Sequence, residues 1–349
     1  MIIPMKIIPE NKLQSNAWDL AQLSHAHPSF LQSWAWGEFQ KQIGNRVVRI
    51  AVSNDSNNII LQAQAIQQSI GFGQSLLYLP RVNLINKQLS TQDQTTALSV
   101  LIDEIKRIAK SSGCAFVRID PPTLDNDIAS NSIYKSLGFI PNPKKSIQPQ
   151  FNQFLELGTD LDRTLQNAKT KTKYNTQLGI KNYDRGNIQV STTTTTDSID
   201  IFLNLINTTS RHQGFTAHSD NYFRNQIKAL TDSGIAELIT ATSTGDPVGA
   251  IFVIYFGNTA TYLHGASNPN YRNLMGSYLL HSIAIQHAIS RGLTYYDLGG
   301  VHPNPDHPWS GITRFKQGFG GQMIKYTGTL ELPISQFKYS IYRLINNLR

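Results

Sequence analysis

Lys316 and Asp120 are the charged residues whose positions in this sequence most favour chemistry. Lys316 follows Phe315, and a lysine held in place can stabilise negative charge that develops in a transition state. Asp120 ends a strand-like run just before two prolines, where a carboxylate can take or hold a proton. The alternatives are a surface lysine beside a core aromatic residue and a turn aspartate with no catalytic role.

Basic residues are densest between positions 169 and 185, beginning with Lys169, Lys171 and Lys173. Lysines interleaved with tyrosines can follow the phosphates of a nucleic acid, although a solvated helix face has the same pattern. The whole chain has 31 Lys and Arg against 23 Asp and Glu, which gives a net charge of +8. This balance favours an anionic partner, namely a nucleic acid, a nucleotide-linked substrate or an acidic bilayer.

Neither a metal site nor an internal disulfide is expected. His302 and His307 flank Asp306 in a proline-rich loop, but their spacing matches no helical ligand pair, and Cys114 is the lone cysteine. We expect this loop to lie over an active-site cleft instead.

The composition of the 349 residues, 40% hydrophobic and 15% charged, predicts a globular protein of two or three domains. Because the sequence has no apolar run of about 20 residues and no signal-peptide pattern, we expect a cytoplasmic protein. Strand and helix patterns alternate along the chain, which predicts a mixed α+β fold. Strands are predicted at 47–52, 59–66, 76–79, 115–119, 236–242, 248–256, 259–264 and 294–298, and helices at 92–110, 131–137, 198–210 and 276–290.

An aromatic–lysine pair followed by Gly-Phe occurs twice, each time after a predicted strand. The first copy is YKSLGF (134–139) and the second is FKQGF (315–319), which predicts duplicated domains. The first copy resembles the last helix and strand of GCN5-related N-acyltransferase folds. The coenzyme A signature of that fold places pyrophosphate at a helix start, but the nearest segment, 272–277, lacks the required glycine spacing. The sequence therefore favours the acyltransferase architecture and argues against coenzyme A.

Six segments, in order along the chain, resemble motifs of the Fem family of non-ribosomal peptidyltransferases (FemA, FemB and FemX types). The resemblance implies two tandem acyltransferase-like domains. The first, 1–150 plus 328–349, would bind the acceptor, and the second, 151–327, would hold the catalytic lysine and the aminoacyl-tRNA end. The stretch 155–186 is too short for the helical arm of larger members, which indicates the compact FemX-like type. The six segments are LQSWAWG (31–37), KTKYN (171–175), TTSR (208–211), YLHGAS (262–267), YDLGG (296–300) and RFKQGFGG (314–321).

The family resemblance implies an enzyme that moves an amino acid from aminoacyl-tRNA to the stem-peptide amine of a peptidoglycan precursor, either UDP-MurNAc-pentapeptide or lipid II. Such transfers build the interpeptide bridge of the cell wall. The ester is already activated, so we expect no cofactor, and we expect a monomer. The alternatives are a tRNA-dependent or acyl-CoA N-acyltransferase acting on proteins, and a non-catalytic RNA- or cell-wall-precursor-binding protein.

The same resemblance assigns roles to single residues. Lys316 would stabilise the oxyanion formed when the amine attacks the ester, Phe315 would stack on the terminal tRNA base, and Asp120 would have a modest role at the amine. The tRNA acceptor stem would be contacted by Lys169, Lys171 and Lys173.

The acceptor is expected to meet a second group of residues. Arg211 would bind its nucleotide or phosphate part through a bidentate guanidinium, unless it merely ends a helix. Phe215 stands where some members have an assisting tyrosine, and it cannot donate a hydrogen bond. Lys41 would contact the phosphates, with Gln40 competing for that register. Tyr271 is a further candidate contact, with an ordinary turn tyrosine as its alternative.

The stretch 335–349 has the pattern of an amphipathic helix. Its apolar face either packs against the first domain or lies on the inner face of the membrane, which would suit a lipid-linked acceptor. That face is formed by Phe337, Ile341, Leu344, Ile345 and Leu348.

Overall fold

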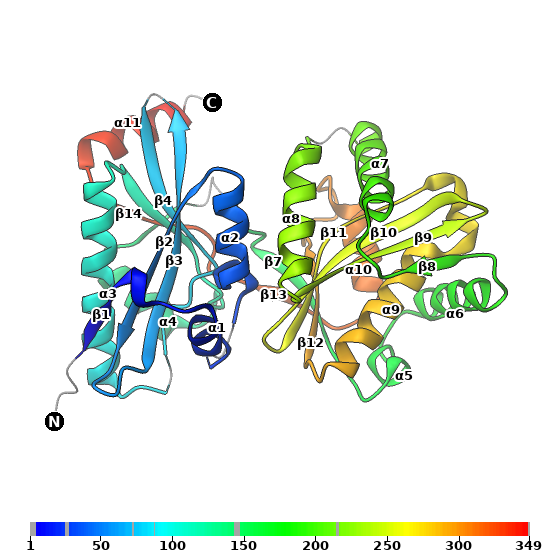
Figure 1. The fold of residues 1–349 in the computed structure, drawn as a ribbon, viewed down its shortest axis with the longest axis horizontal. Coiled ribbons are helices and arrows are strands. Elements are labelled where there is room, and N and C mark those ends of the chain that lie inside the picture. Colours follow the sequence, from blue (N-terminus) through cyan, green and yellow to red (C-terminus); the bar gives the residue numbers. More distant parts are fainter. Residues whose placement is uncertain are drawn as a thin grey trace. The chain divides into compact units, whose positions relative to one another are not determined.

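The structure, a computed structural model, describes residues 5–24, 28–71, 73–86, 88–142, 147–213 and 216–347. The chain forms two compact units, and each is described by itself (Figure 1). Unit 1 comprises Met1–Gln150 and Lys325–Arg349, and unit 2 comprises Phe151–Ile324. The chain therefore returns to unit 1 at residue 325 rather than at residue 328.

Unit 1 is built on a seven-stranded sheet, ordered β1-β2-β3-β4-β5-β14-β6 in the described part of the chain. β4 (Gln74–Pro80) and β5 (Phe116–Asp120) pair in parallel, while the other pairs are antiparallel. β14 (Leu330–Pro333) comes from the far end of the chain and pairs with β5. The remaining strands are β1 (Lys6–Ile8), β2 (Arg46–Ser53), β3 (Ile59–Gly71) and β6 (Ile140–Pro141).

Side chains of β2 alternate between the two faces of this sheet, as the pleat requires. Val48 and Ile50 join the apolar core beneath α3 (Thr91–Ser111), whereas Arg49 points to the face covered by α2 (Trp34–Gln42). The predicted helix at 92–110 therefore faces the core as its apolar spacing indicates. The other helices of unit 1 are α1 (Ser15–Leu23), α4 (Ile128–Ser136), α11 (Gln336–Asn347) and the 3-10 turns η1 (Glu10–Lys12) and η2 (Phe30–Gln32).

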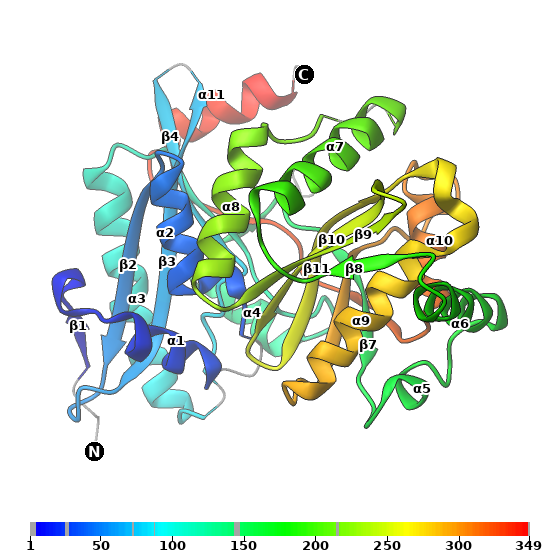
Figure 2. The ribbon, with the colours of Figure 1, turned by 45° about the vertical axis from the view of Figure 1, so that its right-hand side comes forward.

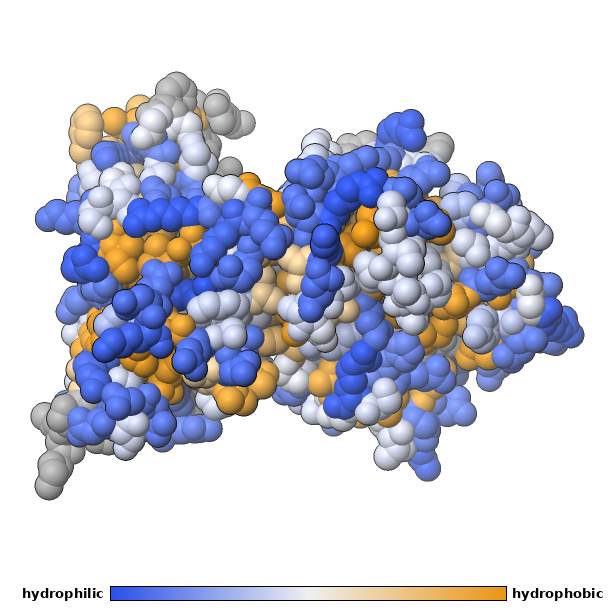
Figure 3. Space-filling view, viewed as in Figure 1, coloured by the Kyte–Doolittle hydropathy of each residue, from blue (hydrophilic) through white to orange (hydrophobic). Residues whose placement is uncertain are grey.

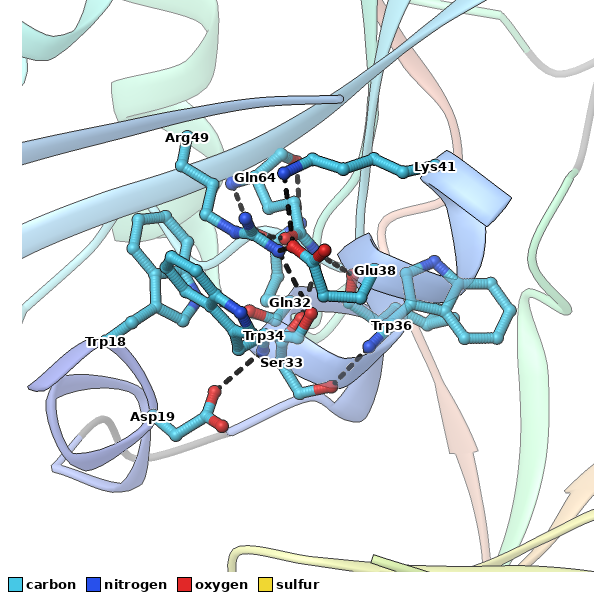
Figure 4. Close-up of polar contacts among 11 residues, drawn as sticks. Trp18, Asp19, Gln32, Ser33, Trp34, Trp36, Glu38, Lys41, Arg49 and Gln64 are labelled. Atoms are coloured by element: carbon cyan, nitrogen blue, oxygen red, sulfur yellow. Dashed lines mark hydrogen bonds and ion pairs between the residues drawn. The ribbon is translucent and has the colours of Figure 1, made fainter. Parts of the chain in front are cut away.

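Figure 4 shows how the segment at 31–37 fastens α2 to the sheet. The buried guanidinium of Arg49 lies 3.6 Å from the ring centre of Trp34 and 2.9 Å from the carboxylate of Glu38. Its Nε also donates to the Gln64 side chain at 2.9 Å. A Cβ at Gly37 would lie 2.4 Å from Arg49 and 2.2 Å from Gln64. The glycine therefore allows α2 to rest directly on a buried polar cluster.

Unit 2 repeats the plan, with strand order β13-β7-β12-β11-β10-β9-β8 over its described residues. β11 (Thr259–Ser267) and β12 (Tyr295–Gly300) form its parallel pair, and β10 (Asp246–Phe256) lies antiparallel to β11. The predicted mixed α+β fold with a duplicated plan is therefore confirmed. The remaining strands are β7 (Phe151–Glu156), β8 (Gln189–Ser191), β9 (Ala236–Ser243) and β13 (Gln322–Lys325).

Helices cover both faces of the unit 2 sheet (Figure 2). α7 (Thr196–Gln213) and α8 (Asp220–Asp232) lie on one face, and α9 (Gly276–Ser290) lies on the other, packed over Ile251 and Val253 of β10. In the described part of the chain, no helix is long and apolar enough to cross a bilayer. The other helices of unit 2 are α5 (Leu161–Thr164), α6 (Thr170–Asp184), α10 (Ser310–Gly318) and the 3-10 helix η3 (Pro269–Leu274).

α11 packs against unit 1 through a face that the sequence pattern did not predict. Tyr339 and Tyr342 are buried against Phe116 of β5, whereas Phe337 and Leu344 are 76% and 62% exposed. Leu348, which was also assigned to the apolar face, lies outside the described residues. The tyrosines turn inward because each ring fills the core while its hydroxyl reaches a buried charged partner.

Those charged partners are Arg118 of β5 and Glu331 of β14, which form a buried ion pair. Nε of Arg118 donates to Glu331 at 2.9 Å. Tyr339 donates to the second Glu331 oxygen at 2.9 Å, and the Tyr342 hydroxyl accepts from Arg118. This network joins the returning end of the chain to the strand that ends at Asp120.

We predict that Glu331→Ala lowers the free energy of unfolding by about 3–5 kcal/mol, because it leaves the Arg118 charge buried without its partner. Urea denaturation followed by circular dichroism measures the change. The control is Glu104→Ala, which removes the partner of Arg107, a side chain that is 66% exposed. Such a surface pair contributes at most about 1 kcal/mol. Equal losses in the two variants would contradict the prediction.

Candidate active site

The candidate site is centred on Lys316, which lies in the last turn of α10. The residue is only 7% exposed. Its Nζ donates to the carbonyl oxygen of Gly300 at 2.8 Å and lies 5.7 Å from the ring centre of Tyr262. Burial lowers the pKa of Lys316 to about 8, although the nearby Asp297 carboxylate acts in the opposite direction. At neutral pH the group is therefore mainly a cation, fixed at one point.

An irregularity at the end of β12 presents the carbonyl that holds Lys316. Oδ1 of the buried Asp297 accepts the backbone N–H of Gly299 at 2.8 Å. The side chain of Asn152, on β7, donates to both Asp297 oxygens at 3.1 and 2.9 Å. Gly299 has a φ of +78°, in the region that favours glycine. Asp297 thus shapes the backbone around the Lys316 ammonium.

Uncharged aromatic side chains pack around Phe315, the residue that precedes Lys316 in α10. The partly buried ring of Phe315 lies 5.2 to 5.6 Å from the rings of Tyr278, His281 and Phe319. Nδ1 of His281 is 2.9 Å from the Tyr296 hydroxyl. Burial first, and then the charge of Lys316, lower the pKa of His281 to about 3. The imidazole is therefore uncharged at neutral pH and adds no second positive charge beside the ammonium. Stacking of Phe315 on a tRNA base stays a prediction.

The equivalent lysine of unit 1 has different surroundings. Lys135 is exposed in the last turn of α4. The preceding Tyr134 is buried, with its hydroxyl 2.9 Å from that of Thr123. The two copies therefore share a packed aromatic residue, but only the second copy buries its lysine.

Asp120 lies at the end of β5 in unit 1 and is buried rather than exposed in a turn. Tyr78 donates to Oδ2 at 2.7 Å, and Thr329 donates to Oδ1. Burial raises the pKa of Asp120 despite these bonds. Both oxygens are engaged, so an effect of Asp120 on a reacting amine would have to pass through these hydroxyl groups.

The structure separates the two residues that compete for the predicted phosphate contact on α2. Gln40 is buried and accepts a hydrogen bond from the Asn45 side chain at 2.8 Å. Lys41 is exposed and pairs with Glu38 at 3.1 Å (Figure 4). Lys41 is thus the side chain that a ligand can reach.

The other predicted acceptor contacts belong to unit 2. Arg211 is exposed near the end of α7, where its Nε donates to the carbonyl oxygen of Asn207 at 3.2 Å. Tyr271 lies in η3 and donates its hydroxyl to Asp246, a hydrogen bond that raises the pKa of this phenol. Phe215 lies outside the described residues.

The predicted tRNA-binding lysines gather at the start of α6, next to the helix that carries Lys316. The side chains of Lys169, Lys171 and Lys173 are exposed. The backbone N–H of Lys169 donates to the carbonyl oxygen of Gly318 at 2.9 Å, so the start of α6 adjoins the end of α10. Cations at the positive end of a helix dipole are unfavourable in isolation, and a bound anion relieves that repulsion.

Sequence reasoning did not single out three residues that hold the site. Tyr262 and Gly300 lie inside the segments that resemble the Fem family, so their position was marked although their roles were not. Asn152 carries no such signal, because only the pairing of β7 with β12 brings it to Asp297. In the described part of the chain, no group of three or more His, Cys, Asp or Glu residues could hold a metal ion.

Each unit thus has the sheet of a GCN5-related acyltransferase, with its parallel pair inside the sheet, and the site lies in the second unit. A tandem GNAT protein from the clavulanic acid biosynthesis pathway shares this fold with a TM-score of 0.55 at 11% identity, covering 95% of this chain and all of that one. The crystal structure of FemX has a TM-score of 0.83 at 21% identity, covering 97% and 99%.

The family model described as FemAB matches residues 19–244 and 233–347, so the chain belongs to the FemAB family. The lipid II:glycine glycyltransferase of Staphylococcus saprophyticus is 22% identical to it, covering 97% of this chain and 95% of that protein. The protein of the same name from Staphylococcus aureus (strain USA300) is also 22% identical, covering 93% and 92%. The predicted family is therefore confirmed.

We predict that the Lys316 ammonium loses its proton with a midpoint near pH 8, well below the ordinary lysine value of about 10.4, because burial disfavours the charged form. NMR titration of protein labelled at the lysine side-chain carbon next to Nζ measures the midpoint. Lys316→Arg identifies the signal by its disappearance. A midpoint near the ordinary value would contradict the buried environment.

Proposed function

We propose that this protein is an aminoacyltransferase that moves an amino acid from aminoacyl-tRNA to the stem-peptide amine of a peptidoglycan precursor, and that it acts as a monomer in the cytoplasm, where charged tRNA is made. The observation that carries the proposal is the buried, fixed ammonium of Lys316. Two relatives that are named lipid II:glycine glycyltransferases support the proposal. The ester of the donor is already activated, so the reaction needs no cofactor.

Lys316 has the properties that this reaction requires. The amine nitrogen attacks the ester carbon, and the carbonyl oxygen becomes an oxyanion that faces the ammonium. The intermediate then collapses, the bond to the ribose oxygen breaks, and the proton lost by the amine ends on that leaving oxygen. Because the Gly300 carbonyl already fixes Nζ at 2.8 Å, stabilising the oxyanion needs little reorganisation. Asp120 supports the reaction indirectly, by positioning Tyr78 and Thr329.

Exposed cations supply the substrate contacts. We assign acceptor contacts separately to Lys41 of unit 1 and to Arg211 and Tyr271 of unit 2. The present partners of the two cations are the Asn207 carbonyl and the Glu38 carboxylate, and exposed contacts of this kind exchange at little cost. The donor tRNA follows the lysines at the start of α6, namely Lys169, Lys171 and Lys173.

The outward stripe of α11 supports a lipid-linked acceptor rather than a UDP-linked one. Phe337, Ile341 and Leu344 repeat at helical spacing and line one side of α11. Lys338 and Arg343 lie beside them. Figure 3 shows apolar surface, in orange, over this helix. An apolar stripe next to cations fits the surface of an anionic bilayer, which is where a lipid-linked acceptor resides.

We predict that Lys316→Ala lowers the rate of transfer about 100-fold or more, because the oxyanion loses its cation, while circular dichroism shows an intact fold. Lys135→Ala, the matched change in unit 1, should leave the rate unchanged.

The assay supplies mixed charged tRNAs with UDP-MurNAc-pentapeptide or lipid II, and mass spectrometry identifies the added residue. Full activity of Lys316→Ala would remove the proposed role. Absence of transfer by the unaltered protein to both acceptors would instead favour a protein-modifying or binding function.

The double substitution Phe337→Ser/Leu344→Ser should reduce binding to vesicles of phosphatidylglycerol about tenfold or more, because it removes the two most exposed apolar side chains of α11. Transfer to lipid II in such vesicles should fall, and transfer to the UDP-linked acceptor should not. Ile128→Ser, a change at an equally exposed apolar residue on α4, is the control. Unchanged sedimentation with the vesicles would refute the membrane contact.

A further inference from the structure

The loop between β12 and α10 carries three aromatic rings that the proposed chemistry does not use, one exposed and two partly buried. The rings of His302 and His307 stack at 3.8 Å with an angle of 15°. Trp309 lies edge-on to His307 at 5.4 Å and is 44% exposed. In the described residues, its indole N–H has no hydrogen-bond partner. We call His302, His307 and Trp309 the aromatic platform.

The loop itself fixes the platform. Nδ1 of His302 accepts the backbone N–H of Asn304 at 3.2 Å, and Nδ1 of His307 accepts that of Trp309 at 3.1 Å. These bonds require both nitrogens to be unprotonated, and they set the ring orientations. The backbone N–H of His302 donates to the Thr313 hydroxyl of α10 at 3.1 Å, and three prolines stiffen the loop. The rings are therefore held in place before any ligand binds.

The loop that carries the aromatic platform adjoins the surroundings of Lys316 at each of its ends. His302 follows two residues after Gly300, whose carbonyl holds the ammonium. Trp309 caps α10 seven residues before Lys316, which is two helical turns, or about 10 Å, along the same side of the helix. Ile312, 41% exposed, lies between them on that side. An apolar strip thus runs from the platform to the proposed reaction centre.

We infer that the aromatic platform stacks a nucleobase of the single-stranded end of the donor tRNA, an inference that rests on the proposed function. Exposed rings on a rigid support bind bases of any identity through their faces. Arg314, exposed on α10, and the lysines at the start of α6 supply positive charge for the phosphates. A separation of about 10 Å equals roughly three stacked nucleotides at about 3.4 Å each. The stacked base therefore precedes the terminal adenosine.

A donor-length series tests this inference. The donors are the aminoacyl ester of a single adenosine nucleotide and an aminoacylated four-nucleotide strand with the sequence of the tRNA 3′ end, and each is used with lipid II and with the UDP-linked acceptor. We expect Trp309→Ala to raise KM for the longer donor about five- to a hundredfold, to leave kcat nearly unchanged, and to leave the single-nucleotide donor unaffected. Trp309→Phe should restore most of the binding. Leu20→Ala, a change at an exposed apolar residue of α1 in unit 1, is the control.

The outcomes separate the inference from the proposed function. Equal KM values for Trp309→Ala and the unaltered protein with the longer donor would overturn the platform while leaving aminoacyl transfer intact. Equal weakening of both donors would also overturn it, because the ring would then act at the reaction centre. A rise in KM for the acceptor instead of the donor would place the sugar of the acceptor on the rings. Failure of the unaltered protein to use either donor would refute the proposed function itself.

Discussion

The hydrogen bond from Lys316 to the Gly300 carbonyl is the interaction on which the candidate site depends. A buried ammonium is costly unless a fixed polar group compensates for the lost water. The structure supplies that group through the YDLGG turn, in which Asp297 holds Gly299 and Asn152 holds Asp297. These contacts draw on β12 and α10, which follow one another in the sequence, and on β7, which lies far before them. Positioning one ammonium therefore depends on two neighbouring strands of the unit 2 sheet and on one helix.

The two units show how a duplicated fold can carry one reactive group. Both sheets contain a parallel pair, β4 with β5 and β11 with β12, and both follow the second strand of that pair with a helix that ends in an aromatic–lysine pair. In unit 1 the aromatic residue alone is buried, and Lys135 remains in water. The irregular end of β12, with its left-handed Gly299, is what creates a carbonyl partner for the lysine of the second copy.

In unit 1 the buried charged residues instead hold elements of the fold together. Arg49 connects α2 to the sheet through Trp34, Glu38 and Gln64, and Arg118 connects β5 to the returning strand β14 and to α11. Removing the partners of a buried guanidinium leaves an unpaired charge in a low-dielectric interior, so each network also fixes the register of the segments it joins. In the aromatic platform of unit 2, backbone N–H groups of the same loop likewise fix the orientation of the His302 and His307 rings.

The sequence alone was sufficient for the family, for the duplicated mixed α+β plan, and for most strands and the long helices α3 and α9, because apolar spacing and glycine positions are local signals. It also marked Lys316 through its motif. It left open whether the apolar face of α11 packs against unit 1, and the structure packs Tyr339 and Tyr342 there instead, because Arg118 and Glu331 lie beneath them. The burial of Lys316, the engagement of both Asp120 oxygens and the role of Asn152 were decided by tertiary structure. Each depends on contacts between residues distant in the chain, and no local pattern encodes which carbonyl or hydroxyl group the fold brings to a charge.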